Sequence, residues 1–524
     1  MLNTLHQHLK DPRKCKIFWS LIFGLIWLGT NIYVIMETPV WNEKYITAFI
    51  LGNICMFIAA AYMVFVYRSV KKIDTLTESK IQHYYKMSMW ILGLAVLLVP
   101  FFFIIHVPDT AHDWDFFVIF RDTMQLGGRS FTHLPMTEDE LLYFLRYPNN
   151  QFFGIVYNTL FAPFTTNLSR IIATTVVAAI LTSLSVLGGS LIIKKISNLK
   201  MALIYNLVAF GFIPFYLYGA QLYTDTATLP FVIFGLLFMI YALQSEKTSK
   251  MIIWWIAACL VVFFGYSIKP TVFIPMIAVF CFLVLNRKWK KLLIMLPIAA
   301  LLFVGVHQGV KAVIANEPAF SEQANDRYNL PMIHWVTMSF DPINKYGGFN
   351  PDVLAYSQSF TDVASKKEGI KHRFIENLKE MGVPGVLVQL WRKIMYTWFN
   401  GDLSNFFYTY RHSNPFIFRY FDWTSFAPEE GNITGWLLIK AAQTLYWLAI
   451  VPLMWYEIFL GIFKKHKTEW FIVGLSMAGL TGFLLLWEAN SRYLYNFAPI
   501  MLILATMGLV DFIQRSRRKN GISE

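Results

Sequence analysis

Long apolar runs constrain what this 524-residue chain can fold into more than any other feature of its sequence. A helix that crosses a bilayer needs about 20 consecutive, predominantly apolar residues. Such runs recur along the chain, and we expect an all-α polytopic membrane protein with about twelve spans. They are predicted near residues 17–35, 45–67, 88–106, 169–193, 202–219, 226–243, 251–267, 271–285, 292–310, 436–463, 469–487 and 493–512.

The composition agrees with a surface that faces lipid. Hydrophobic residues make up 56% of the chain and charged residues 15%, whereas a soluble domain usually carries about 25% charged residues. The run from Phe152 to Phe164 is too short for a full span, and we expect it to be re-entrant or interfacial. If that run crosses the bilayer, the number of spans rises to about thirteen.

The net charge of +13 lies in short clusters beside the apolar runs, in every second loop. Cytoplasmic loops of membrane proteins are enriched in Lys and Arg. We therefore expect a multi-pass protein of the cell membrane with both termini in the cytoplasm, rather than a nucleic-acid-binding protein with a basic stripe. The extracytoplasmic face then carries two large polar regions, 107–168 and 311–435.

The loops and spans divide the chain into four expected parts. Residues 1–87 hold a cytoplasmic segment and two additional transmembrane helices. Residues 88–310 form a transmembrane core whose first large outer loop is 107–168. Residues 311–435 form the second outer region, and residues 436–524 form the last helices and a basic cytoplasmic tail.

Two aspartates open the first large outer loop. Asp113 and Asp115 precede a stretch, 116–126, whose apolar spacing predicts an amphipathic helix on the membrane surface. A carboxylate at such a junction is partly shielded from water and can act as a general base on a hydroxyl. The alternative is that these aspartates cap the N-terminus of the helix.

Two cations stand out in otherwise neutral outer loops. Lys269 follows directly after a span, and Arg492 lies between Glu488 and Tyr493. Such cations can pair with a lipid phosphate or with an outer-face aspartate. The alternative is that both side chains only snorkel to the interface.

Other polar and aromatic residues of the outer face are candidates for binding a substrate. Gly347 and Gly348 permit a close backbone approach, and the aromatic residues around them can stack on a sugar or merely cover a turn. The two asparagines after Tyr147 can bind a polar substrate or cap a helix. The candidates are Tyr147, Asn149, Asn150, Asp225, Trp335 and Asn350, with His334 as a further phosphate ligand.

Several motifs that would indicate another chemistry are missing from the sequence. It has no Walker loop, no Rossmann glycine pattern and no Cys/His cluster with zinc spacing. Asp113 and Asp115 form a D-x-D pair, which is too short a match to imply a metal. We expect no cofactor, and the sequence leaves a divalent metal open.

The order of these features resembles the GT-C membrane glycosyltransferases, a superfamily related to the protein O-mannosyltransferases and the lipid A aminoarabinose transferase. A span is followed by an outer loop that opens with an aspartate, then by the helix, and then by Tyr147-Pro148-Asn149-Asn150 leading into an apolar helix. Further stretches are similar to cell-surface glycosyltransferases of Gram-positive bacteria: 268–271, 334–335, 347–350 and 492–493.

The resemblance implies an enzyme that transfers a sugar, with inversion, from a polyprenyl-phosphate donor to an acceptor hydroxyl on the extracytoplasmic face. It implies Asp115 as the catalytic acid, because Asp115 stands about two helical turns before the small residue Thr123, with Asp113 in reserve. Expected partners are the donor lipid, such as an undecaprenyl-phosphate sugar, membrane lipids, and a glycan, lipid or protein acceptor. Teichoic acid and other cell-wall polysaccharides are among the candidate acceptors.

Two other function classes share this layout. A flippase or transporter of polyprenyl-linked substrates can also have about twelve spans with both termini inside. A polysaccharide polymerase or ligase would share the long outer loop and the polyprenyl substrate.

Overall fold

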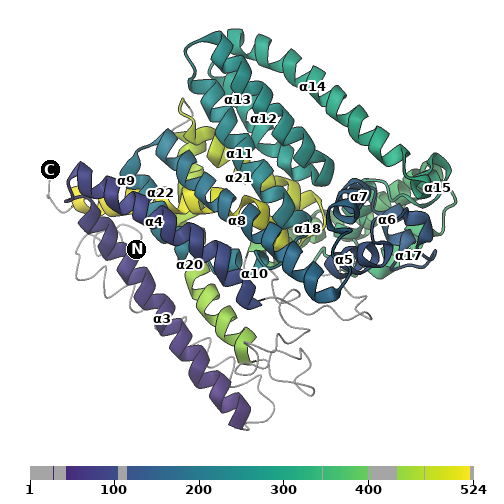
Figure 1. Ribbon diagram of the computed structural model, residues 1–524, viewed down its shortest axis with the longest axis horizontal. Helices are drawn as coiled ribbons and strands as arrows, with labels where there is room; N and C mark the ends of the chain where they lie inside the picture. The colour runs from purple at the N-terminus through teal and green to yellow at the C-terminus, as the bar shows by residue number, and fades with distance from the viewer. Residues whose placement is uncertain are drawn as a thin grey trace.

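The computed structural model describes residues 28, 43–103, 115–344, 346–398, 403, 434–464 and 467–519, and every regular element within them is helical. Figure 1 shows long helices gathered in one bundle, with shorter helices at one end of it. The prediction of an all-α polytopic membrane protein is confirmed.

Eight helices of the described chain are long and apolar enough to cross a membrane. The candidate spans are Asn53–Ile73, Glu78–Phe102, Asn167–Ile196, Thr224–Gln244, Thr248–Ile268, Trp289–Ala315, Ala442–Phe463 and Ser491–Gln514. Three further apolar helices are shorter: Leu199–Phe210, Pro270–Leu285 and Trp470–Leu486. The first expected span, 17–35, lies outside the described residues, so the total number of spans stays a prediction.

The elements of the bundle come from three stretches of the chain, 43–103, 167–315 and 434–519, and the connections inside each stretch are short. They are α3 (Glu43–Ile73), α4 (Glu78–Leu98), η1 (Val99–Phe103), α8 (Asn167–Ile196), α9 (Leu199–Phe210), α10 (Pro214–Tyr218), α11 (Thr224–Gln244), α12 (Thr248–Ile268), η3 (Pro270–Phe273), α13 (Ile274–Leu285), α14 (Trp289–Ala315), α20 (Thr434–Phe463), α21 (Trp470–Leu486), η5 (Ser491–Phe497) and α22 (Ala498–Lys519).

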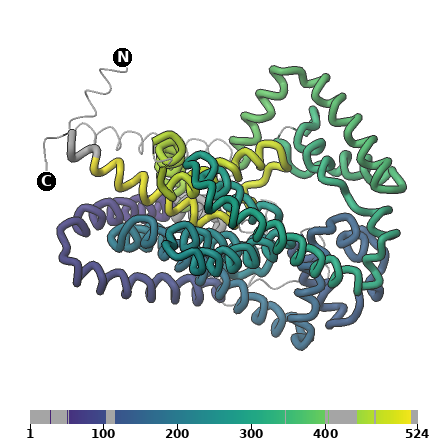
Figure 2. The backbone as a smooth tube through the Cα atoms, turned by 90° about the horizontal axis from the view of Figure 1, so that it is seen from above, coloured from purple at the N-terminus to yellow at the C-terminus, as the bar shows by residue number. Residues whose placement is uncertain are grey.

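Several short helices and one long helix, α18, which is kinked at Gly382, form the end that corresponds to the two expected outer regions. They are α5 (Asp115–Leu126), η2 (Phe131–His133), α6 (Leu141–Arg146), α7 (Asn149–Phe161), η4 (Pro318–Phe320), α15 (Glu322–Tyr328), α16 (Ile333–Ser339), α17 (Pro351–Gln358) and α18 (Val363–Trp398). Figure 2 shows the first of these groups in blue and the second in green, both at the same end of the molecule.

One expected span is broken in two. The run 202–219 forms α9, which ends at Phe210, and α10, which begins at Pro214. Proline has no backbone N–H to continue a helix, and its fixed φ suits the first turn of a new one. The apolar run was identified correctly, but the single helix was not.

The helix expected after Asp115 is present as α5, but it does not lie open on a surface. Its residues from Phe116 to Thr123 are all buried, because 116–120 is an unbroken apolar stretch that packs within the protein. The guanidinium of Arg170 donates hydrogen bonds to Thr123 Oγ1 at 2.8 Å and to the Phe161 carbonyl at 3.0 Å. These bonds join α5, α7 and α8, which fixes the position of Asp115.

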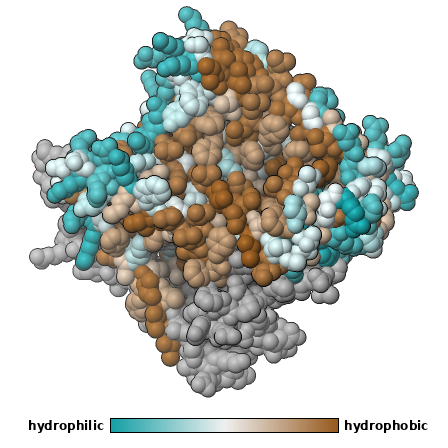
Figure 3. Space-filling model, in the orientation of Figure 1, coloured by the Kyte–Doolittle hydropathy of each residue, from teal (hydrophilic) through white to brown (hydrophobic). Residues whose placement is uncertain are grey.

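The surface of the molecule is divided as a membrane protein requires. Figure 3 shows a broad hydrophobic belt across the middle of the described surface, with hydrophilic residues on either side of it. Many large apolar side chains of the described residues are exposed, among them Ile253, Leu293 and Leu301 at 64%, 72% and 74%. Such a continuous apolar surface is stable against lipid rather than water.

Candidate active site

Three segments that are far apart in the sequence bring one anion and two cations together. Asp225 lies in the first turn of α11, Lys269 directly follows α12, and Arg492 lies in η5. The Lys269 ammonium donates a hydrogen bond to Asp225 Oδ1, and Arg492 Nε lies 3.5 Å from Asp225 Oδ2. The side chains of Asp225, Lys269 and Arg492 are only 1%, 12% and 5% exposed.

Asp115, the first residue of α5, adds a second carboxylate to this cluster. Its Oδ2 accepts a hydrogen bond from the Tyr223 hydroxyl at 3.1 Å and lies 3.5 Å from Arg492 Nη2. The Asp115 side chain is 37% exposed, whereas that of Asp225 is 1% exposed. Asp225 is therefore the buried counter-ion, and Asp115 is the carboxylate that a substrate can reach.

A buried amide holds the segments of the cluster in register. Asn496 Nδ2 donates hydrogen bonds to Thr271 Oγ1 at 3.1 Å and to Thr228 Oγ1 at 3.5 Å. These three residues lie one helical turn or less beyond Arg492, Lys269 and Asp225. Since a buried polar group is costly to leave unpaired, the contact favours one arrangement of η5, η3 and α11.

Tyrosine rings pack against the two cations. The Lys269 ammonium lies 4.7 Å from the centre of the Tyr493 ring, and the Arg492 guanidinium lies 5.3 Å from the same ring and 5.2 Å from that of Tyr223. A cation over an aromatic face gains about 0.5–2 kcal/mol. The rings thus help to keep both charges in a place from which water is largely removed.

Glu488 is a further acid of the site that sequence reasoning missed. Its Oε2 accepts a hydrogen bond from the Tyr493 hydroxyl at 3.2 Å. Burial raises the pKa of Glu488 to about 7, against the lowering effect of the Arg492 charge. The one available signal was its position four residues before Arg492 and just after the C-terminal end of α21.

Tyr143 and Tyr147 form a wall on the α6–α7 side. Burial, together with the negative charge of Asp115, raises the pKa of both phenols. Asn150 Nδ2 donates a hydrogen bond to the Tyr143 hydroxyl at 2.7 Å, and Asn149 Nδ2 donates to Asn150 Oδ1 at 3.1 Å. Neither asparagine caps α7, whose N-cap position is taken by Pro148 without a side-chain bond.

Trp335 continues this wall in the second outer region. The centres of the Tyr147 and Trp335 rings are 6.3 Å apart. Trp335 stacks on Trp487 at 5.1 Å and 12°, and Trp487 directly precedes Glu488. Aromatic surface therefore lines the approach to the charged cluster from both outer regions.

A buried lysine fixes the segment that carries Trp487 and Glu488. Lys393 Nζ donates hydrogen bonds to Ser339 Oγ and to the carbonyls of Leu485 at 2.5 Å and Trp487 at 2.8 Å. Burial lowers the pKa of Lys393 to about 7. The cation thus ties α18 to the outer end of α21.

Gly347 confirms the expected close backbone approach. Its φ is +68°, and an added Cβ would lie 2.9 Å from the Ser339 carbonyl oxygen. The Gly347 carbonyl accepts a hydrogen bond from the Ala489 amide at 2.7 Å. The loop therefore packs directly on the segment that leads to Arg492.

Two predicted site residues do not join the charged cluster, and a third has no described position. His334 Nδ1 lies 2.8 Å from Ser357 Oγ, and burial lowers the pKa of His334 to about 4, so the ring is uncharged at neutral pH. Asn350 caps α17, since its Oδ1 accepts hydrogen bonds from the backbone amides of residues 352 and 353. Asp113 lies outside the described residues.

Metal ligands do not gather in the part of the chain that the structure describes, where no group of three His, Cys, Asp or Glu side chains could hold an ion.

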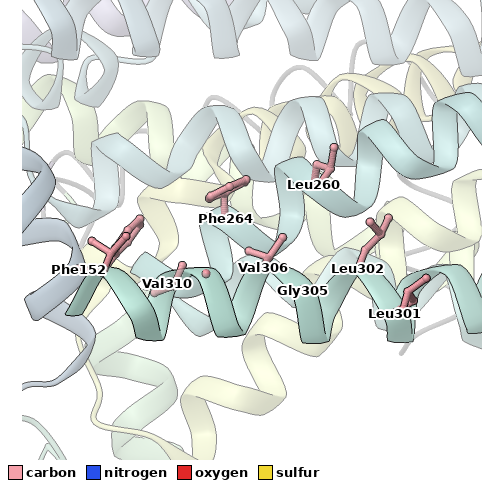
Figure 4. Close-up of a pocket in the computed structure, with 10 residues that line it drawn as sticks. Phe152, Leu260, Phe264, Leu301, Leu302, Gly305, Val306 and Val310 are labelled. Atoms are coloured by element: carbon pink, nitrogen blue, oxygen red, sulfur yellow. The ribbon is translucent and has the colours of Figure 1, made fainter. Parts of the chain in front are cut away.

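An apolar groove of about 590 Å³ runs along the bundle. It is lined by α12 and α14, and Phe152 of α7 closes one end (Figure 4). Gly305 and Gly309 face open space, where an added Cβ would meet nothing within 4 Å. Helix α7, which carries Phe152, also carries Asn150, whose side chain contacts Tyr143.

Comparison with known proteins identifies a family and distant structural relatives. The family model described as "Conserved hypothetical integral membrane protein" matches residues 10–511. A comparison with curated proteins finds no match.

Two solved structures illustrate the structural relatives. Archaeal oligosaccharyltransferase AglB from Archaeoglobus fulgidus, in complex with an inhibitory peptide and a dolichol-phosphate, is 12% identical over 85% of this chain and 52% of that chain, with a TM-score of 0.42. ArnT from Cupriavidus metallidurans, bound to undecaprenyl phosphate, is 9% identical over 83% of this chain and 78% of that chain, with a TM-score of 0.34.

Both proteins are GT-C enzymes, the superfamily that the sequence resembles. The chain spans about half of the length of AglB. Because both TM-scores lie below 0.5, residue roles are assigned from the geometry of this chain alone.

Proposed function

The chain belongs to the family described as conserved hypothetical integral membrane proteins, and we propose that it is a membrane glycosyltransferase. In this proposal it transfers a sugar, with inversion, from a polyprenyl-phosphate carrier to an acceptor hydroxyl on the extracytoplasmic face. One observation carries the proposal: a reachable carboxylate, Asp115, lies 3.5 Å from Arg492 in a cluster that also holds Lys269. A base beside two cations is what the transfer of a sugar from a phosphate requires.

The proposed reaction uses each of these groups once. Asp115 accepts the proton of the acceptor hydroxyl while the hydroxyl oxygen attacks the anomeric carbon. The bond between that carbon and the phosphate oxygen breaks, and its electron pair leaves with the polyprenyl phosphate. Lys269 and Arg492 face the new negative charge, and such preorganised charges can contribute several kcal/mol in a site with little water.

The charges of the site suit a phosphate. Asp115 and Asp225 are balanced by Lys269 and Arg492, so the four groups together carry no net charge. Because the pKa of Glu488 is raised to about 7, this acid carries only part of its negative charge near neutral pH and repels a phosphate less than a fully ionised carboxylate would. Asp225 uses one donor of the Lys269 ammonium, which has three.

The carrier lipid fits the same region. In the proposal its prenyl chain lies in the apolar groove between α12 and α14, and its phosphate lies past Phe152 at the charged cluster. Burial of apolar chain in such a groove is favourable at roughly 25 cal/mol per Å². Tyr147, Asn149 and Trp335 then border the sugar and the acceptor, and His334 can contribute only as an uncharged group.

The test is transfer of labelled sugar from a panel of polyprenyl-phosphate donors, undecaprenyl-phosphate sugars included, into membranes that contain the full chain. We expect wild-type transfer to fall by about 10²–10⁴-fold in Asp115→Asn, the usual contribution of a general base. Asp122→Asn is a matched control on the same helix. Asp122 is buried and accepts hydrogen bonds from Arg121, so this variant reports what the loss of a carboxylate of α5 outside the charged cluster does to folding and transfer.

The other outcomes separate the alternatives. Loss of transfer only in Asp113→Asn would keep the reaction and move the base. Movement of an intact lipid-linked sugar across the membrane, without transfer from any donor, would support a flippase. Transfer only from diphosphate carriers would support a polymerase or ligase, and full activity in both aspartate variants would refute the assigned base.

A further inference from the structure

A second groove lies along α4, between residues 84 and 92. The segment that leads to Asp115 follows the C-terminal end of the same helix. Helices α3 and α4 are joined by a short turn, 74–77, and diverge from it in both Figure 1 and Figure 2. The space between them is lined by both helices and by α9, and its volume is about 460 Å³. That volume is within the range of roughly 300–1,000 Å³ that small-molecule sites occupy.

The groove has the length of one membrane leaflet. Along α3 it extends from Tyr62 to Lys72, ten residues that span about 15 Å at 1.5 Å per residue. The hydrocarbon core of a bilayer is about 30 Å thick, so one leaflet contributes about half of that. Tyr62 lies near the middle of the candidate span Asn53–Ile73, which places the inner end of the groove near the middle of the bilayer.

The sides of the groove are apolar and open to lipid. Phe65, Ile91 and Phe210 line it and are 53%, 51% and 40% exposed. At its inner end the Tyr62 hydroxyl donates a hydrogen bond to the Leu207 carbonyl. A hydrocarbon chain can therefore enter from the side and lie along the groove as far as Tyr62, the last lining residue on α3 at this end.

The other end of the groove is polar and cationic. Lys72 lines it in the last turn of α3. The segment around the turn carries five cations and two acids, namely Arg68, Lys71, Lys72, Lys80 and Lys86 with Asp74 and Glu78. Basic pockets between transmembrane helices at a membrane surface are favourable sites for anionic lipid headgroups.

Asn206 is a buried amide side chain that lines the groove, and it lies next to Leu207 at the inner end. Its side chain lines the groove, is 1% exposed, and donates through Nδ2 to Ser88 Oγ at 2.8 Å. Its Oδ1 has no hydrogen-bond partner among the described residues.

From these observations we propose that the α3–α4 groove is a binding site for one anionic phospholipid of the leaflet that adjoins the 74–77 turn. The phosphate of the lipid lies at Lys72, and one acyl chain follows Ile91 and Phe210 towards Tyr62. A second protein helix is a poorer occupant, because the groove ends at Tyr62 and spans only half of the bilayer. The site is separate from the charged cluster around Asp115, and it does not depend on the proposed transfer reaction.

The test is retention of phosphatidylglycerol by the purified full chain in detergent, measured by native mass spectrometry, with phosphatidylcholine as the uncharged competitor. We expect wild type to retain one phosphatidylglycerol in preference to phosphatidylcholine. Lys72→Gln should weaken this retention by roughly five-fold, the contribution of one cation at a membrane surface. Ile91→Trp, which fills the groove without removing a charge, should abolish it.

Two control variants are matched to these changes. Lys71 is the neighbouring cation, but its ammonium lies 4.5 Å from the Tyr67 ring and does not line the groove. Leu94 is an equally exposed apolar residue of α4 outside the groove. Lys71→Gln and Leu94→Trp should therefore retain the lipid as wild type does.

Four results would overturn the proposal. The first two are equal retention of phosphatidylglycerol by Lys72→Gln and Lys71→Gln, and retention by Ile91→Trp that equals that of wild type. The third is equal binding of phosphatidylglycerol and phosphatidylcholine by wild type. The fourth is displacement of phosphatidylglycerol by an equimolar polyprenyl phosphate. The last result would assign the groove to the carrier lipid instead. None of these readouts requires transfer activity, so the two proposals can fail separately.

Discussion

Replacing Asp225 with Asn tests whether the charged cluster is held together by a buried counter-ion. The change keeps the size of the side chain but leaves Lys269 and Arg492, at 12% and 5% exposure, without their common anion. Removing one partner of a buried ion pair typically costs 3–5 kcal/mol. Arg492 keeps Asp115 at 3.5 Å, so we expect a loss at the lower end, about 3 kcal/mol.

The assay is equilibrium unfolding of the purified protein in mixed micelles with increasing SDS. Asp225→Asn combined with Lys269→Met should recover at least about 1 kcal/mol relative to the sum of the single changes, since contacting charges couple by 0.5–3 kcal/mol. As a contrast, Glu368→Gln breaks an exposed pair with Lys371 at 3.7 Å and should change stability by less than about 1 kcal/mol. A neutral Asp225→Asn, or strictly additive effects, would refute the reasoning.

The remaining predictions concern the outer region. Burial lowers the pKa of Lys393 from 10.5 to about 7. Between pH 7 and pH 10.5 the unfolded chain therefore binds a proton that the folded chain does not. The free energy of unfolding should rise with pH across that window. Lys393→Met should remove this rise, whereas Lys379→Met, at an exposed lysine, should not. Both are measured by unfolding at a series of pH values. A pH dependence in Lys393→Met that equals that of wild type would contradict the pKa assignment. Gly347→Ala should destabilise the fold by about 1 kcal/mol or more, because φ is +68° and the added Cβ would lie 2.9 Å from a carbonyl oxygen. Gly309→Ala, in open space within a helix, should be neutral or stabilising by up to about 1 kcal/mol, and similar Tm values for both alanine variants would refute the strain at Gly347.

The spans could be predicted from the sequence because a bilayer imposes one length and one polarity on every segment that crosses it. The break at Pro214 could not be placed, since apolar composition continues through 202–219 without a charge. The burial of α5 was also missed. Hydrophobic periodicity separates apolar from polar faces, but it does not say whether the apolar surface meets lipid or protein.

The charged residues of the site could be predicted, but most of their partners could not. Lys269 and Arg492 stood out because cations are uncommon in outer loops, and Asp115 stood out by its place after a span. Their meeting at Asp225 joins residues 115, 225, 269 and 492, and no local pattern encodes such distant contacts. Glu488 was not predicted as a site residue, because only its position before Arg492 marked it in the sequence. Asn350 was predicted to bind substrate, but its side chain caps α17.

The most direct test of the central claim is a single-turnover experiment that separates donor binding from sugar transfer. The purified full chain in nanodiscs would be loaded with the polyprenyl-phosphate sugar that wild type uses, and then mixed with acceptor. If Asp115 is the general base, Asp115→Asn should bind the donor within about two-fold of wild type, because Lys269 and Arg492 remain, and transfer should be at least about 10²-fold slower. Transfer at the wild-type rate once donor is bound, or loss of donor binding with the rate unchanged, would contradict the assigned role.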